Sequence, residues 1–178
     1  MSSFLREIFI TILIASLLFL SAQYSIQNPE VIGPSMQPAL HTGERVLINK
    51  LSYRFGKLPQ RGDIIVLDPP DKSGSMDYIK RIIGLPGESV ELRGGATYIH
   101  AADGVYELQE PYVQVPSTQN YIGDVIPPGQ YFVMGDNRNN SNDSRSGWTV
   151  PLRDIVGKAW AITWPISEMS HAPNYALY

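Results

Sequence analysis

Hydrophobic residues follow two patterns along the chain, one continuous and one interrupted. The continuous pattern covers residues 8–26, which carry no charge, Pro or Gly. At about 1.5 Å of rise per residue, a helix over this stretch would match the thickness of a bilayer core. We therefore predict a retained N-terminal transmembrane helix, a membrane anchor over residues 1–28. A cleaved secretory signal and a buried helix of a soluble protein are the alternatives.

The charges on either side of this stretch predict its orientation. Arg6 and the amino terminus precede it, whereas the first charge beyond it is Glu30 and the first cation is Arg45. The positive-inside rule then places the amino end in the cytoplasm. We expect a single-pass protein of a cell membrane, plasma or internal, with residues 29–178 as an extracytoplasmic domain beside the lipid bilayer.

The interrupted pattern consists of short apolar and β-branched runs separated by turn sequences such as Pro127-Pro128-Gly129. No helical run lies between them, so we predict a mainly β domain with antiparallel sheets arranged as a sandwich or barrel. Residues 91–128 have the pattern of hairpins inserted into the main sheet. The predicted strands cover residues 45–51, 63–67, 78–83, 89–92, 96–100, 105–108, 131–134 and 155–164.

Composition excludes several classes of protein. All 14 Pro and 15 Gly lie from Pro29 onward, which excludes a helical bundle, and 43% hydrophobic residues make disorder improbable. The net charge is −3, so the composition does not indicate the positively charged surface that binds nucleic acid. Cys is absent and the three His have no metal-ligand spacing, so we expect no disulfide, thiolate nucleophile, metal or other cofactor.

A polar run at residues 135–145 lies between apolar segments. It is not a calcium loop, because Arg138 and Gly147 occupy positions where such a loop needs oxygen ligands. A solvated loop is one interpretation. Polar groups enclosed by buried segments must find partners, however, so the run could also pack against the rest of the domain.

One serine and one lysine have a sequence context that could support catalysis. Gln37 and Pro38 exclude the nucleophile elbow and the penicillin-binding motif around Ser35. Lys80 and Arg81 are neighbours in an apolar strand, so one of them should point toward the apolar face. A lysine held there has a lowered pKa and can act as a general base, although most strand lysines are simply solvated.

Four blocks of sequence resemble the type I signal peptidases, membrane-bound serine proteases that remove signal peptides from exported preproteins. The blocks follow the apolar segment in the family's order and together span most of the chain from residue 33 to residue 164. They read GPSMQPAL (33–40), RGDIIV (61–66), YIKRIIGLPGE (78–88) and GDNRNNSNDSRSGW (135–148).

The resemblance implies roles for individual residues. Ser35 would be the nucleophile, Lys80 the general base, and Ser141 the hydroxyl that orients Lys80. The chain departs from some members of the family at Gly33, where they carry a Ser that donates to the oxyanion. Structural ion pairs would involve Asp143, Arg145 and Arg81, and the pockets for small substrate side chains would involve Val31, Met36, Leu40, Tyr78 and Ile79.

Two other functions fit parts of the same pattern. A related Ser–Lys protein that cleaves itself would use the same dyad, but the apolar segment and the lack of a DNA-binding domain argue against it. An anchored β domain that binds export partners through an inactive dyad is the non-enzymatic alternative.

Overall fold

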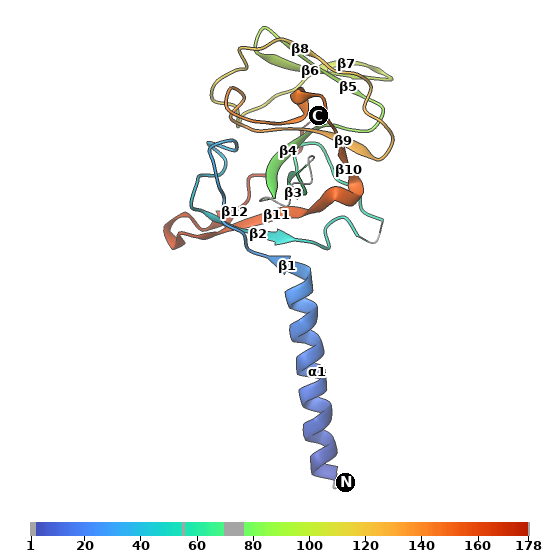
Figure 1. Cartoon of the computed structure of the whole chain (residues 1–178), viewed down its shortest axis with the longest axis vertical. Helices are drawn as coiled ribbons and strands as arrows, with labels where there is room; N and C mark the ends of the chain where they lie inside the picture. Colours follow the sequence, from blue (N-terminus) through green and yellow to red (C-terminus); the bar gives the residue numbers. More distant parts are fainter. Residues whose placement is uncertain (1–2, 55, 70–76, 178) are drawn as a thin grey trace.

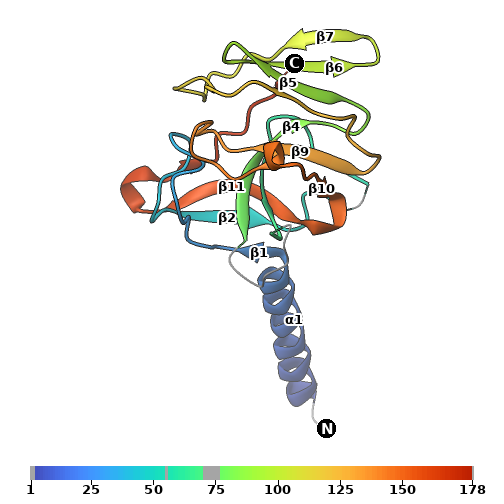
Figure 2. The same cartoon turned by 45° about the horizontal axis from the view of Figure 1, so that its top comes forward.

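The computed structural model describes residues 3–54, 56–69 and 77–177, and strands make up most of its main body. Helix α1 (Ser3–Ser25) projects from one end of this body as a separate stem (Figure 1). Two sheets form the body, and Figure 2 shows the smaller one at the end remote from α1. Every strand pair in the described ranges is antiparallel, which confirms the predicted antiparallel β class.

The larger sheet has the strand order β1-β2-β11-β3-β4-β9-β10, with β12 paired to β11. The smaller sheet has the order β7-β6-β5-β8 and overlaps the predicted hairpin insertion. The larger sheet contains β1 (Ile26–Gln27), β2 (Arg45–Asn49), β3 (Ile64–Leu67), β4 (Tyr78–Gly84), β9 (Gln130–Met134), β10 (Val150–Pro151), β11 (Ile155–Trp164) and β12 (Ser170–His171). The smaller sheet contains β5 (Ser89–Arg93), β6 (Ala96–Ala101), β7 (Gly104–Glu107) and β8 (Tyr121–Ile122).

Each of the eight predicted strands is present, with ends that differ by a few residues at most. The strands that the pattern did not predict are β1, β8, β10 and β12, and each has only two residues. Two residues are too few to show an alternation of apolar and polar side chains, so such strands leave no signal. Three short 3₁₀ turns complete the elements: η1 (Ser144–Ser146), η2 (Leu152–Asp154) and η3 (Ile166–Glu168).

The predicted amino-terminal helix is present as α1. Within the residues that the structure describes, however, no helix is both long and apolar enough to cross a membrane. The prediction of a transmembrane helix is therefore not supported by the structure.

The β3–β4 hairpin lies at the centre of the larger sheet and sets the position of the candidate site. All of β3 is buried, and its register pairs Ile65 with Lys80 and Ile64 with Arg81. Because side chains alternate along a strand, Lys80 and Arg81 project to opposite faces of the sheet. On its other side β4 pairs with β9, which continues directly into residues 135–143.

Candidate active site

Ser35 lies in a tight turn that precedes β2 in the chain. The turn is closed by main-chain hydrogen bonds from Gln37 to Pro34 and from Leu40 to Met36. Met36 and Leu40 are buried beside β2, β3 and β11 in one apolar cluster. This packing fixes the turn, and the side chain of Ser35, directly before Met36, stays partly exposed.

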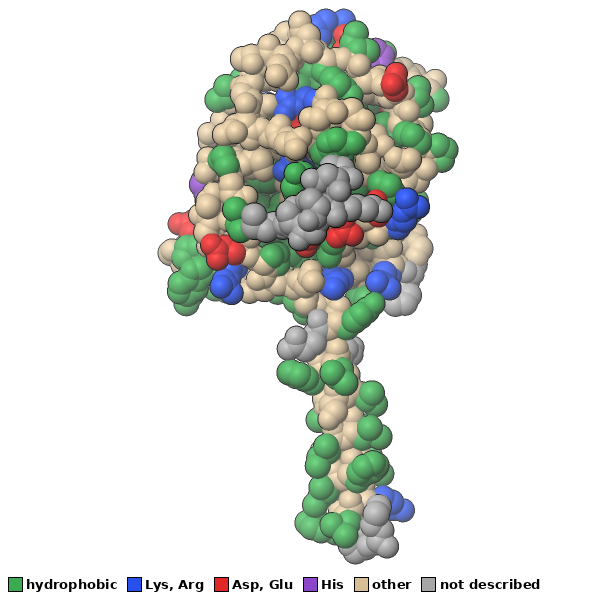
Figure 3. All heavy atoms as spheres, viewed as in Figure 1, with side chains coloured by type: hydrophobic (Ala, Val, Ile, Leu, Met, Phe, Trp, Pro, Cys, Tyr) green, Lys and Arg blue, Asp and Glu red, His purple; other side chains and the backbone are tan. Residues whose placement is uncertain are grey.

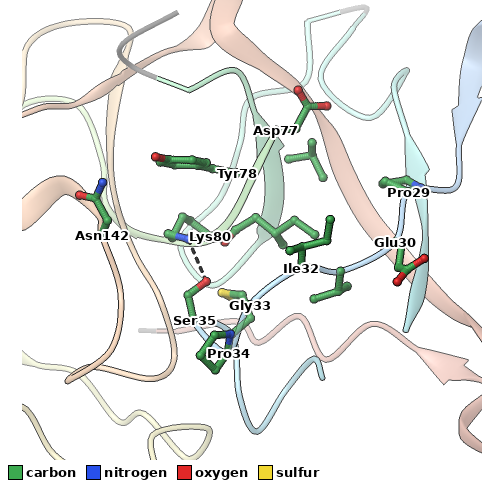
Figure 4. A pocket seen from close by; sticks show the side chains of 14 residues that line it. Pro29, Glu30, Ile32, Gly33, Pro34, Ser35, Asp77, Tyr78, Lys80 and Asn142 are labelled. Atoms are coloured by element: carbon green, nitrogen blue, oxygen red, sulfur yellow. Dashed lines mark hydrogen bonds between the residues drawn. The ribbon is translucent and has the colours of Figure 1, made fainter. Parts of the chain in front are cut away.

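Lys80 reaches Ser35 from the neighbouring part of the larger sheet. The Lys80 side chain is buried, and its Nζ donates hydrogen bonds to Ser35 Oγ at 3.0 Å and to the Ile79 carbonyl at 2.9 Å. Figure 4 shows the two side chains meeting at the floor of a cleft, with the Tyr78 ring above them. The structure therefore brings together the serine and the lysine that the sequence singled out.

The surroundings of Lys80 favour its neutral form. Burial lowers the pKa of Lys80 to about 8, although the negative charges of Asp143 and Asp136 act in the opposite direction. Loss of hydration is the largest of these effects, and both carboxylates have guanidinium partners. A substantial share of Lys80 is then neutral in mildly alkaline water, whereas a solvated lysine there is almost entirely protonated.

The polar run packs against the Ser35 turn and is not a free loop. The Asn137 main-chain N–H donates to the Ser35 carbonyl at 3.0 Å, and Asn137 Nδ2 donates to the Pro34 carbonyl at 3.2 Å. Gly135 lies so close that a Cβ built on it would collide with Ser141 Oγ and the Ser35 carbonyl oxygen. Among the described residues the buried Ser141 hydroxyl has no hydrogen-bond partner, so the predicted bond from Ser141 to Lys80 is not formed here.

Ion pairs hold the polar run and β4 beside the cleft. Asp143 receives hydrogen bonds from Arg145 Nε at 2.8 Å and Nη2 at 2.9 Å, and it also accepts from the Gly135 N–H. Arg81 does not pair with Asp143. Its guanidinium binds both carboxylate oxygens of Asp136, at 2.8 and 2.6 Å, and both side chains are fully buried.

Sequence reasoning missed Asp136, although the residue lies within the polar run that it identified. The signal that could have found it is the requirement that a buried Arg81 have a carboxylate partner on a neighbouring segment. Arg138 makes a second buried pair, to Glu110, and donates to Thr97 on β6. This side chain ties the smaller sheet to the run that carries Ser141.

The cleft around Ser35 and Lys80 has a volume of about 660 Å³. Four of the five predicted pocket residues line it, namely Val31, Met36, Tyr78 and Ile79. Leu40 does not line the cleft, because it is fully buried in the apolar cluster beneath it. The sequence analysis did not assign to the cleft the other lining residues Pro29, Glu30, Ile32, Pro34, Val66, Asp77 and Asn142.

Within the described ranges, no group of three or more His, Asp or Glu side chains is placed to hold a metal ion. The contact between Ser35 and Lys80 offers the chemistry of a serine hydroxyl beside a desolvated amine.

An antiparallel β-fold with a serine hydroxyl held against a buried lysine defines a candidate serine hydrolase. The profile of the family described as "Signal peptidase, peptidase S26" matches residues 2–164, so the chain belongs to this family of hydrolases.

Individual proteins of the family are similar over most of the chain. "Probable signal peptidase I-1" of Synechocystis sp. is 40% identical, over 97% of this chain and 89% of that protein. "Signal peptidase I T" of Bacillus subtilis is 37% identical, over 89% of this chain and 84% of that protein. A crystal structure of a signal peptidase I from Enterococcus faecalis matches with a TM-score of 0.50 and 34% identity, covering 57% of this chain and 97% of that one.

Gly135→Ala tests whether the close approach of the polar run to Ser35 matters for hydrolysis. The added Cβ must displace Ser141 or the Ser35 carbonyl, so we expect kcat/KM for a peptide substrate to fall about 100-fold. Gly84→Ala is the matched control, since its Cβ would collide with Ile126 in a different cluster. The control should lower Tm yet keep kcat/KM within about twofold. Equal losses in both variants would contradict the prediction.

Proposed function

We propose that this protein is a membrane-associated serine endopeptidase that removes signal peptides from exported preproteins with a Ser35–Lys80 dyad. The observation that carries the proposal is the buried Lys80 Nζ at 3.0 Å from Ser35 Oγ, at the floor of an open cleft. Membership of the peptidase S26 family and the names of the relatives support the substrate class.

The proposed reaction begins with the neutral form of Lys80. The Ser35 hydroxyl then donates its hydrogen bond to the Nζ lone pair and transfers the proton as Oγ attacks the scissile carbonyl. Collapse of the tetrahedral intermediate breaks the peptide bond, and Lys80 returns the proton to the departing amine of the mature chain. Water activated by Lys80 then hydrolyses the acyl-enzyme and releases the signal peptide.

Main-chain and apolar groups around the dyad would bind the substrate. The Ser35 N–H makes no hydrogen bond to other described residues and is free to donate to the oxyanion. The substrate would lie extended in the cleft, as a strand added beside the sheet, with small side chains against Val31, Met36, Tyr78 and Ile79. Ser141 would hold Lys80 in position once the substrate has closed the cleft.

Exposed apolar side chains support a location of the protein at a membrane surface. Apolar residues of α1 are exposed along its length, and Figure 3 shows them around the stem. Four further apolar side chains on and after β11 are more than half exposed, namely Trp160, Trp164, Ile166 and Met169. The labels of β11 and β12 lie in the half of the body nearer to α1 (Figure 1). We propose that these surfaces contact a lipid bilayer on its extracytoplasmic side, which would bring the cleft close to membrane-inserted substrates.

Removing either member of the dyad should abolish cleavage. We expect Ser35→Ala and Lys80→Ala each to reduce kcat/KM on a purified preprotein by about 10⁴-fold or more, and the double variant to be scarcely worse. The effects should not add, because the two groups act as one unit. Lys57→Ala and Ser170→Ala, both at exposed positions, should leave cleavage unchanged. Near-normal turnover of Lys80→Ala would reject the assignment of the base.

Cleavage should depend on pH through Lys80. Protonated Lys80 has no lone pair, so kcat/KM should be lost as pH falls through the folded pKa, with an acid limb at about 8. About one pH unit below that midpoint, activity should be about tenfold lower than the plateau. Tryptophan fluorescence over the same range checks that the protein stays folded. A single midpoint near about 10.4 would identify an ordinary solvated lysine and contradict the mechanism.

Binding to lipid tests the proposed location. The full chain should float with vesicles of phosphatidylglycerol and phosphatidylcholine, and Leu13→Asp with Leu17→Asp should weaken this partitioning at least about tenfold. The matched control places two charges at exposed apolar residues of the smaller sheet, Val105→Asp with Ile122→Asp. Equal partitioning of all three proteins would reject contact through α1.

A further inference from the structure

The last residues of the chain run back against the strands that carry the candidate dyad. The Pro173 carbonyl accepts a hydrogen bond from Arg81 Nη1 at 2.8 Å, and the Tyr175 ring lies 5.2 Å from the same guanidinium. A Cβ on Gly62 would collide with the Tyr175 main chain, so only glycine allows the tail this close to the start of β3. This tail lies beyond residues 2–164, which the family profile matches.

Asn174 uses its side-chain amide to bridge two strands at the point where they separate. β11 pairs with β3 as far as Lys158 and Ile65, and farther along, from Ala161, it pairs with β12 as well as with β2. Asn174 Oδ1 accepts the Ile64 N–H at 2.8 Å, and its Nδ2 donates to the Ala159 carbonyl at 3.0 Å. The amide thus replaces the missing peptide unit between β3 and β11.

On β3, the bridged residue Ile64 and its neighbour Ile65 both pair with the part of β4 that carries Lys80. Ile64 is the register partner of Arg81, and Ile65 is the register partner of Lys80. Arg81 in turn is held between Asp136, the Gly62 carbonyl and the Pro173 carbonyl. The tail therefore fixes the β3–β4 hairpin at the Ile64–Arg81 pair, next to the pair that contains the proposed base.

The same tail also reaches the turn that carries the proposed nucleophile. Ala172 is buried in the apolar cluster that contains Val31, Met36 and Leu40, on both sides of Ser35. Its N–H donates to the Trp160 carbonyl on β11, which anchors the tail to the sheet. Within four consecutive residues the tail contacts the packing beneath Ser35 and the strands beneath Lys80.

We propose that residues 172–175 act as a strap that fixes Lys80 relative to Ser35, and that Asn174 is its main positioning residue. The strap touches neither the cleft nor the substrate. It acts through Ile64, Arg81 and the cluster beneath Ser35, so its loss should change the alignment of the dyad more than the binding of substrate. This inference rests on the proposed role of the dyad.

Asn174→Ala tests the strap with one kinetic and one structural readout. We expect kcat for preprotein cleavage to fall about tenfold, with KM within about twofold, because a base displaced by a fraction of an ångström mainly affects the transition state. Hydrogen exchange at the Ile64 amide should accelerate at least about tenfold relative to that at Val90 in the smaller sheet.

Two further variants separate positioning from general stability. Ile99→Val removes a methyl group from the core of the smaller sheet, so it should lower Tm but leave kcat and Ile64 exchange unchanged. Asn174→Asp keeps the acceptor for Ile64 but loses the donor to Ala159, so its kcat should also fall, and this loss of kcat is the deciding readout if Asn174→Ala does not fold.

Unchanged kcat and unchanged Ile64 exchange in the Asn174 variants would overturn the strap, as would an equal loss of kcat in Ile99→Val. Failure of the parent protein to cleave any preprotein would overturn the proposed function instead. Ile64 exchange distinguishes these two failures, because it reports on the strap in the absence of substrate.

Discussion

The desolvation of one amine is the constraint on which the rest of the site depends. An exposed Lys80 would be protonated and could not accept a proton. A buried, neutral Lys80, however, provides no positive charge to the two nearby carboxylates, which then need other cationic partners. The structure resolves this conflict by giving each carboxylate its own guanidinium, Arg145 for Asp143 and Arg81 for Asp136. Burial can then dominate the pKa of Lys80 even though two acidic residues lie near it.

The antiparallel topology brings three distant parts of the chain to this point. The Ser35 turn packs on one side, the β3–β4 hairpin supplies Lys80 at the centre, and β9 delivers the polar run from the other side. Arg138 then connects the polar run to Thr97 and Glu110 in and beside the smaller sheet. No described residue of the smaller sheet lines the cleft, yet this sheet helps to hold the polar run that packs against Ser35.

Sequence alone predicted the features that local pattern controls. The eight longer strands and the pairing of Ser35 with Lys80 follow from alternation, turn residues and motif resemblance, whereas the pattern leaves open whether the polar run is a solvated or a packed loop. It did not predict that Arg81 pairs with Asp136, or that Leu40 lies beneath the cleft and not in its wall. Strand periodicity gives the face of a residue, but the partner of a buried charge depends on which loops pack against that face.

The role of the tail, residues 172–175, is the clearest example of a structural feature that a local sequence pattern cannot predict. Residues 172–175 have no strand or helix period, and Asn174 contributes through a side-chain amide that imitates a peptide bond between β3 and β11. Such a bridge is needed only because β11 extends past its last pair with β3, at Lys158, before it pairs with β12 at Ala161, which is a property of the whole sheet. Residues that close a gap of this kind must be found from the packed structure, even when they lie directly behind the chemical groups that the sequence identifies.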